Sequence, residues 1–290
     1  MYKPLILCLL LGITSIGHSS DPTEINLSSI FSNQDITSKT KAGVAVSPAH
    51  LRFDVNPGNS EMKTITVNND TDKSNSFKAS FNDFNMNGYG KSEFLPAGSG
   101  EYSLSRWVAV SPSYVDLKPG EKVELTVTVL IPEDHPDANK AAWSILLIEQ
   151  AEERKSLEQE DGEEKIAFGV IPTFAFGVFL YQNPPNVEVT DVDIIDVNVH
   201  TDEITKSMTI DVENKGDGIS YCTVYVDLTN LDTGETEKLA VKKFTIVPGL
   251  KRAFNFPIPL TQTAGNYSAV SVLDFGSDVE LEAAEIEFKL

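Results

Sequence analysis

The stretch IAFGVIPTFAFGVFLY, residues 166–181, carries the clearest pattern in the chain. Its even positions hold large apolar residues and most of its odd positions are small or polar. The even residues are Ile166, Phe168, Val170, Pro172, Phe174, Phe176, Val178 and Leu180. Apolar residues at every second position are typical of a β-strand, because successive side chains point to opposite faces. The alternation and the internal glycines argue against a membrane helix. We therefore predict a long strand with large apolar side chains on one face. Pro172 indicates an edge position or a bulge.

Short apolar runs separated by Pro and Gly turns precede this stretch. They predict strands at 44–55 (broken near Pro48), 62–67, 76–84, 106–110, 122–131 and 142–150. Short strands with a turn signal about every 8 to 12 residues are typical of an antiparallel sandwich. Strands do not alternate with long helices, which disfavours a parallel α/β sheet.

A second set of strands follows the proline-rich segment NPPN at 183–186, which we interpret as a stiff hinge. The predicted strands are 187–199, 207–214, 221–228, 239–247, 252–257, 265–275 and 284–290. About seven strands in roughly 105 residues fit an immunoglobulin-like sandwich. We therefore predict an all-β chain of two immunoglobulin-like β-sandwich domains set at an angle, spanning 43–182 and 187–290.

The charge of the chain excludes one class of partner. Its 290 residues include 43 acidic and 23 basic side chains, for a formal net charge of -20. Such a chain repels nucleic acid phosphates and anionic lipids, so we expect neither as a partner.

The N-terminus has the pattern of an export signal. Lys3 precedes an apolar run at 4–17, and the small residues Ser19 and Ser20 follow it. The run is shorter than the roughly 20 residues that a membrane-spanning helix needs. We predict a signal peptide at 1–20 that is cleaved near Ser20, no membrane insertion afterwards, and a flexible leader at 21–42.

Cleavage at Ser20 would leave Cys222 as the one cysteine, so the mature chain would have no internal disulfide. Cys222 lies in an alternating run, and we interpret it as a buried structural thiol. The acidic segment 151–165 is either a solvated helix or a flexible hairpin loop, and Asp161-Gly162 favours the loop.

Several stretches of residues 43–185 together resemble the periplasmic pilus chaperones of the chaperone-usher class. They are the early strand and turn of 44–70 with TITVNN at 64–69, WVAVSP at 107–112 leading to LKPG at 117–120, and IPED at 131–134 followed by AWSIL at 142–146. In this resemblance residues 166–181 occupy the position of the family's last strand, and the second sandwich is similar more weakly.

The resemblance implies a periplasmic protein that binds exported pilus-like subunits by strand addition, with an outer-membrane assembly protein as a further partner. An added strand would give main-chain hydrogen bonds, while Ile166, Phe168, Val170, Phe174 and Phe176 would fill pockets of the subunit. Alternatively, the apolar face of this strand fills the chain's own core. Partner binding and core packing are both possible if Val178 and Leu180 point inward and the earlier residues outward. The exposed strand could also support self-association.

One feature departs from the family. Family chaperones hold the subunit's terminal carboxylate with a basic pair, one residue on the first strand and one on the last. The first-strand position falls near His50 and Arg52, whereas 167–181 contains no Lys or Arg. Arg52 is then either the carboxylate anchor or an ordinary surface arginine, and the client or the way it is held differs from the family's.

Patterns of catalytic or metal-binding residues are absent from the sequence. His50, His135 and His200 have no HExxH or CxxC context. Asp191, Asp193, Asp196 and Asn198 resemble calcium ligands but alternate as a strand would and lack the EF-hand glycine and glutamate.

We therefore expect no enzyme, metal site or cofactor. The alternative functions are a surface adhesin or structural envelope module with the same fold and, more weakly, a carbohydrate-binding or hydrolytic protein.

Overall fold

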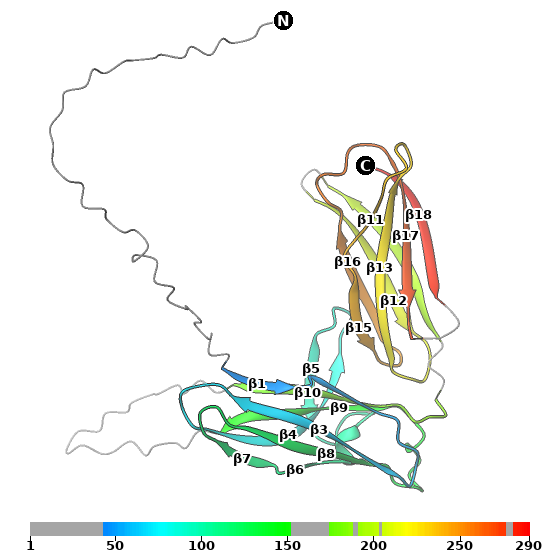
Figure 1. Ribbon diagram of the computed structural model, residues 1–290. Helices are drawn as coiled ribbons and strands as arrows, with labels where there is room; N and C mark the ends of the chain where they lie inside the picture. The colour runs from blue at the N-terminus through cyan, green and yellow to red at the C-terminus, as the bar shows by residue number, and fades with distance from the viewer. Residues whose placement is uncertain (1–42, 152–173, 188–190, 203–204, 277–280) are drawn as a thin grey trace, which may run out of the picture. The chain divides into compact units, whose positions relative to one another are not determined.

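The computed structural model describes residues 43–151, 174–187, 191–202, 205–276 and 281–290 (Figure 1). The predicted signal peptide and leader lie outside these residues. So do the acidic segment except Ala151, and the first part of the predicted long strand, 166–173.

Two sheets form the first sandwich. The first sheet has the order β1 (Val44–Ser47), β3 (Ser60–Asn69), β8 (Lys122–Leu130), β6 (Val108–Ser111). The second has the order β2 (His50–Phe53), β10 (Ala175–Gln182), β9 (Ala142–Ala151), β4 (Asn75–Met86), β5 (Ser92–Pro96), with β7 (Tyr114–Leu117) also paired to β4. The chain changes sheets at Pro48, between β1 and β2, where the sequence predicted a break.

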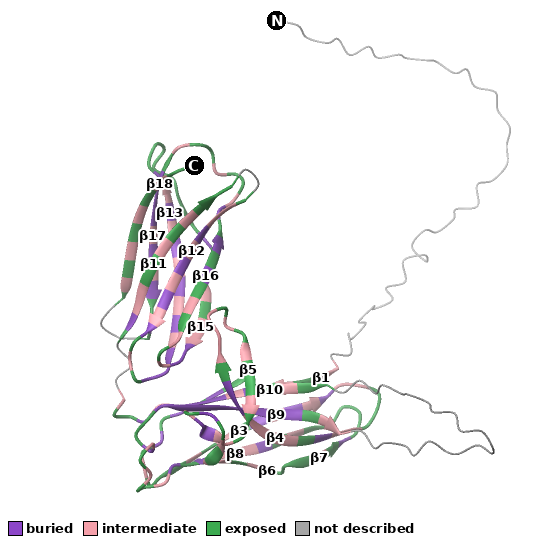
Figure 2. Cartoon of the chain, turned by 180° about the vertical axis from the view of Figure 1, so that it is seen from behind, coloured by how far each residue is buried: buried purple, intermediate pink, exposed green. Residues whose placement is uncertain are grey.

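Alternate residues of both sheets form the first core, as the bands of buried residues in Figure 2 show. Ile65 and Val127 come from one sheet, and Phe53, Leu146 and Leu180 from the other, each at most 1% exposed. Strand β9 is covered on both faces, because Trp143 and Ile145 join a separate cluster with Phe84, Tyr181, Ile219 and Val247. This burial explains its nearly continuous apolar sequence.

The second sandwich also has two sheets. One has the order β11 (Val192–Thr201), β12 (Lys206–Asn214), β16 (Lys251–Pro257). The other has the order β14 (Thr236–Lys238), β13 (Ser220–Asn230), β17 (Asn266–Asp274), β18 (Glu282–Lys289), with β15 (Lys242–Ile246) also paired to β13. Every second residue of β13 is buried, including Cys222, which is a free thiol.

The prediction of an all-β chain of two sandwiches is confirmed. Individual strands differ from it. The predicted strand 106–110 begins only at Val108, because Leu104–Arg106 forms a 3-10 turn in which Trp107 N–H donates to the Leu104 carbonyl. The predicted strand 239–247 is shorter, because only β15 (Lys242–Ile246) falls within it, and β14 (Thr236–Lys238) lies just before it. Strands β5 and β7 were not predicted, because each is short and pairs with a single neighbour, β4.

The end of β10 is fixed beside β2 by a buried amide. Gln182 is 1% exposed. Its Nε2 donates to the Val55 carbonyl at 2.7 Å, and its Oε1 accepts from Val55 N–H at 3.1 Å. One side chain thereby satisfies both backbone groups of Val55, two residues beyond the end of β2.

We predict that Gln182→Ala lowers the free energy of unfolding by about 1–3 kcal/mol, because it leaves two buried backbone groups unpaired. Urea denaturation measures the loss. Gln150→Ala is the matched control, since the Gln150 amide donates to Asn75 Oδ1 at 2.9 Å in a less buried position. Equal effects of the two substitutions would contradict the role of Gln182.

We also predict that Cys222 is inert in the folded protein. Burial raises its pKa from 9.0 to about 12, so the neutral thiol is favoured at ordinary pH. A thiol-specific reagent at pH 8, with the labelled site mapped to Cys222, should react at least a hundredfold faster in urea than in the native state.

The same shift makes stability depend on pH. Because the folded pKa is raised, the contribution is fully present below about pH 9 and is lost as the pH rises towards 12. The urea midpoint of Cys222→Ala should therefore fall less over this range than that of the unsubstituted protein. If the urea midpoints of the two proteins fell equally, or if the native protein were labelled rapidly, the thiol would be accessible.

Candidate functional site

A cavity of about 680 Å³ lies where residues of β2, β3, β13 and β15 meet. Its wall includes three cationic side chains, those of Arg52, Lys63 and Lys243, together with Tyr221 and Phe244. None of the residues that line it carries a carboxylate. This cationic wall contrasts with the net charge of -20 on the chain as a whole.

Arg52 is held in the cavity wall by an aromatic ring. Its guanidinium carbon lies 3.4 Å from the centroid of the Tyr221 ring, a cation–π contact. Burial raises the pKa of Tyr221, so the ring stays neutral. Among the described residues Arg52 forms no ion pair, so its charge is positioned but not neutralised.

The other two cations differ in their partners. Lys63 Nζ donates to the Arg52 carbonyl oxygen and lies 3.1 Å from Glu61 Oε1. It therefore links β3 to β2 and has a counter-ion. Lys243, on β15, is exposed and has no ion pair within the part of the chain that the structure describes.

His50 also lines the cavity, but as a neutral ring. It stacks on Phe179 and Tyr181, with ring centroids 5.6 and 6.2 Å apart. Burial, and then the charge of Arg52, lower its pKa below 6.5. The structure thus places His50 and Arg52, the two residues singled out from the sequence, at one cavity. Of these two, only Arg52 is a cation at neutral pH.

Lys63 and Lys243 were not predicted as site residues from the sequence. A second cation was sought on the last strand, whereas these two come from β3 and from the second sandwich. Each is one lysine in an ordinary alternating strand, so no local signal marks it. The juxtaposition follows from the fold alone.

Strand β10 and Phe174, the residue before it, present a row of apolar side chains whose burial increases along the chain. Phe174 is 42% exposed, Phe176 is half-buried against the first core, and Val178 and Leu180 are at most 1% exposed. The Phe174 ring lies 5.4 Å from that of Phe176 and 6.5 Å from that of Phe77. Ile166, Phe168 and Val170, which were predicted to continue the row, lie outside the described residues.

The two sides of β10 are paired over different lengths. Strand β9 pairs antiparallel with all of Ala175–Gln182, whereas β2 pairs in parallel only from Phe179 to Gln182. Within the described residues, no strand pairs with the β2 side of residues 175–178. The first half of β10 is therefore an edge, and β2 begins where this edge ends.

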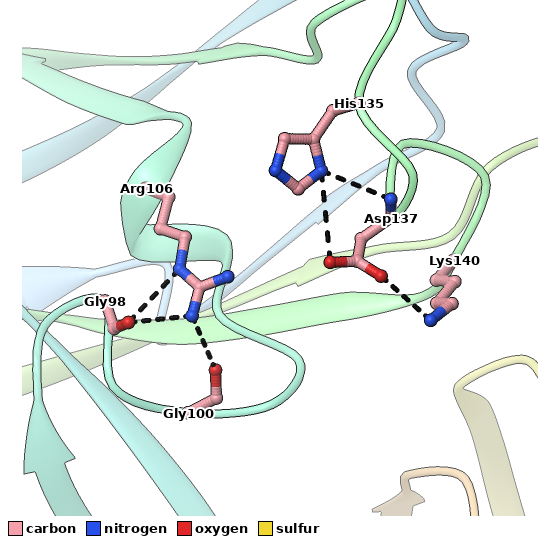
Figure 3. A network of polar contacts seen from close by, with 6 residues as sticks. All are labelled: Gly98, Gly100, Arg106, His135, Asp137 and Lys140. Atoms are coloured by element: carbon pink, nitrogen blue, oxygen red, sulfur yellow. Dashed lines mark hydrogen bonds and ion pairs between the residues drawn. The ribbon is translucent and has the colours of Figure 1, made fainter.

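A second polar cluster lies beside the 3-10 turn (Figure 3). Arg106 donates to the carbonyls of Gly98 and Gly100, at 2.8 Å for the shortest contact. Asp137 pairs with Lys140 at 2.8 Å, a hydrogen bond that lowers the pKa of its carboxyl group. The Arg106 contacts tie the loop at 98–100 to the 3-10 turn, which is a structural role.

No group of three or more His, Cys, Asp or Glu side chains in the described residues could hold a metal ion. Asp193 lies 2.5 Å from Lys215, and Asp196 accepts a hydrogen bond from Asn198, so these carboxylates already have partners. No helix among the described residues is long and apolar enough to cross a membrane.

No family model and no curated protein sequence matches the chain. Among solved structures, the class 5 fimbriae chaperone CfaA matches with 13% identity and a TM-score of 0.43, over 84% of this chain and 98% of its own. The E. coli chaperone DraB matches with 15% identity and a TM-score of 0.39, over 84% and 98%.

The CsuC–CsuE chaperone–tip adhesion subunit pre-assembly complex of Acinetobacter baumannii matches with 12% identity and a TM-score of 0.39, over 77% of this chain and 93% of the matched chain. These proteins are of the kind that the sequence resemblance named.

Proposed function

We propose that the chain is a periplasmic chaperone that binds exported, pilus-like subunits by β-strand addition and helps their folding or assembly. The observation that carries the proposal is the half-paired strand β10. It combines a graded apolar row with an edge at residues 175–178, and β2 begins where that edge ends.

Strand addition would satisfy both features of the edge. An added strand supplies the missing main-chain hydrogen bonds, and Phe174, with Phe168 and Val170 before it, enters pockets of the client. Val178 and Leu180 stay in the chain's own core and hold β10 in place. One strand then serves the fold with its second half and the client with its first half.

The cavity would hold the end of the client. An added strand that runs in the same direction as β10, as β2 does, reaches the start of β2 with its carboxyl end. Arg52 lies on β2 opposite Tyr181, beside that point. A terminal carboxylate there would form a charge-assisted hydrogen bond with the guanidinium. Lys63 and Lys243 would supply the positive charge that the last strand lacks.

The location and the other partners in this proposal rest on the sequence. The predicted signal peptide at 1–20 supports export to the periplasm, where exported subunits would be the clients. An outer-membrane assembly protein and a second copy of the chain are further partners within the proposal. Binding of this kind requires neither catalysis nor a cofactor.

We expect Phe174→Asp to lower client capture about thirtyfold, because a charge replaces an apolar residue at the centre of the contact. The mature protein is captured from the envelope of its native host, and co-purified proteins are quantified by mass spectrometry. Tyr114→Asp is the control, since Tyr114 is 53% exposed on β7, away from the β10 edge.

The double variant Phe168→Asp, Val170→Asp tests the undescribed part of the row in the same assay. Undiminished capture by both β10-row variants would refute strand addition. If the protein instead fractionates with outer-membrane material and carries no subunit, the adhesin or structural module becomes the better function.

Arg52→Ala should weaken binding of a purified client roughly tenfold or more, because it removes a charge-assisted hydrogen bond. A client with an amidated C-terminus should bind the unsubstituted protein and Arg52→Ala equally, since the carboxylate is then absent. Isothermal titration calorimetry of the four combinations gives the coupling. Lys122→Ala, an exposed lysine on β8, controls for net charge. If Arg52→Ala weakened the binding of the client with a free C-terminus and of the client with an amidated C-terminus equally, Arg52 would not bind the carboxylate.

A further inference from the structure

The cavity contains more positive charge than one carboxylate can balance. Lys63 has Glu61 as its counter-ion at 3.1 Å. Arg52 and Lys243 have no ion pair among the described residues, and the Arg52 guanidinium lies over the neutral ring of Tyr221. An occupant that left one of these two cations without a counter-charge would forgo a favourable interaction. Two unpaired cations therefore favour an occupant with two anionic groups.

The cavity is also larger than a chain end requires. Its volume of about 680 Å³ is well above that of one carboxylate and lies in the range of about 300–1,000 Å³ that holds small organic ligands. Tyr221 and Phe244 provide apolar wall, and Thr223 and Thr245 provide polar wall. This lining suits a whole residue, with an aliphatic stem and a polar head.

Lys243 and Arg52 come from different sandwiches, Arg52 from β2 and Lys243 from β15. Arg52 is the cation beside the edge of β10, where the end of an added strand would lie. Lys243 is then free to meet a second group of the same residue.

We propose that the cavity binds the acidic C-terminal residue of a client, with Arg52 taking the terminal carboxylate and Lys243 taking the side-chain carboxylate of a final Glu or Asp. The inference rests on the proposed function, because it names the kind of client end that the strand-addition site selects. The surrounding chain carries a net charge of -20 and repels acidic peptides elsewhere, so the selection is confined to the cavity.

The test uses fluorescent twelve-residue peptides of alternating Val and Ser that end in Gly-Glu or Gly-Gln, each with a free or an amidated C-terminus. Binding to the mature protein is measured by fluorescence anisotropy at low salt, for the unsubstituted protein and for Lys243→Ala, Arg52→Ala and the control Lys122→Ala. Each variant is first checked for an unchanged urea midpoint.

The unsubstituted protein should bind the Glu ending about tenfold more tightly than the Gln ending. Lys243→Ala should reduce this ratio to near one and keep the preference for a free over an amidated end. Arg52→Ala should abolish the preference for a free over an amidated end and keep the preference for Glu over Gln. Lys122→Ala should change neither preference. High salt should weaken the Glu preference.

Two outcomes overturn the inference in distinguishable ways. If all free-ended peptides bind but Glu and Gln endings bind equally, the preference for an acidic end is wrong and the chaperone function stands. If no peptide binds while the free dicarboxylate succinate binds in a Lys243-dependent manner by calorimetry, the cavity takes a small dianion, and both this inference and the strand-addition proposal are refuted.

Discussion

The short parallel pairing of β2 with the second half of β10 is the constraint on which the binding surface depends. It extends over four residues, from Phe179 to Gln182, and the amide of Gln182 closes its end against Val55. A longer β2 would cover the edge of β10, and a shorter one would remove Arg52 from the cavity. The place where β2 begins therefore sets both where an added strand can pair and where its end must lie.

Much of the fold could be predicted from the sequence, because alternation and turn residues act locally. Residues 175–180 alternate in burial as their sequence alternates, and a Cβ at Gly177 would lie 2.6 Å from Ile145 Cδ1, so a larger residue there would require the Ile145 side chain to move. Strands β5 and β7 escaped prediction, since a short strand with one neighbour leaves little periodicity to detect.

The cationic cavity could not be predicted in the same way. It forms in a chain with nearly twice as many acidic as basic side chains, so composition points away from it. Arg52 could be singled out through the family resemblance, but Lys63 and Lys243 belong to strands that only tertiary structure brings to β2. A resemblance directs attention to the family's own positions, and here the second cation lies elsewhere in the fold.

The two roles of β10 are compatible because burial changes steeply along it. Val178 and Leu180 are fully buried and each contributes about 1.5–3 kcal/mol to folding, whereas Phe174 keeps 42% of its surface exposed and contributes much less. An exposed apolar row beside an unpaired edge is also a template for self-association. Two copies of a chain with a net charge of -20 repel each other, while a client that carries less negative charge does not meet this barrier. The acidity of the chain therefore favours a client over a second copy at the same edge.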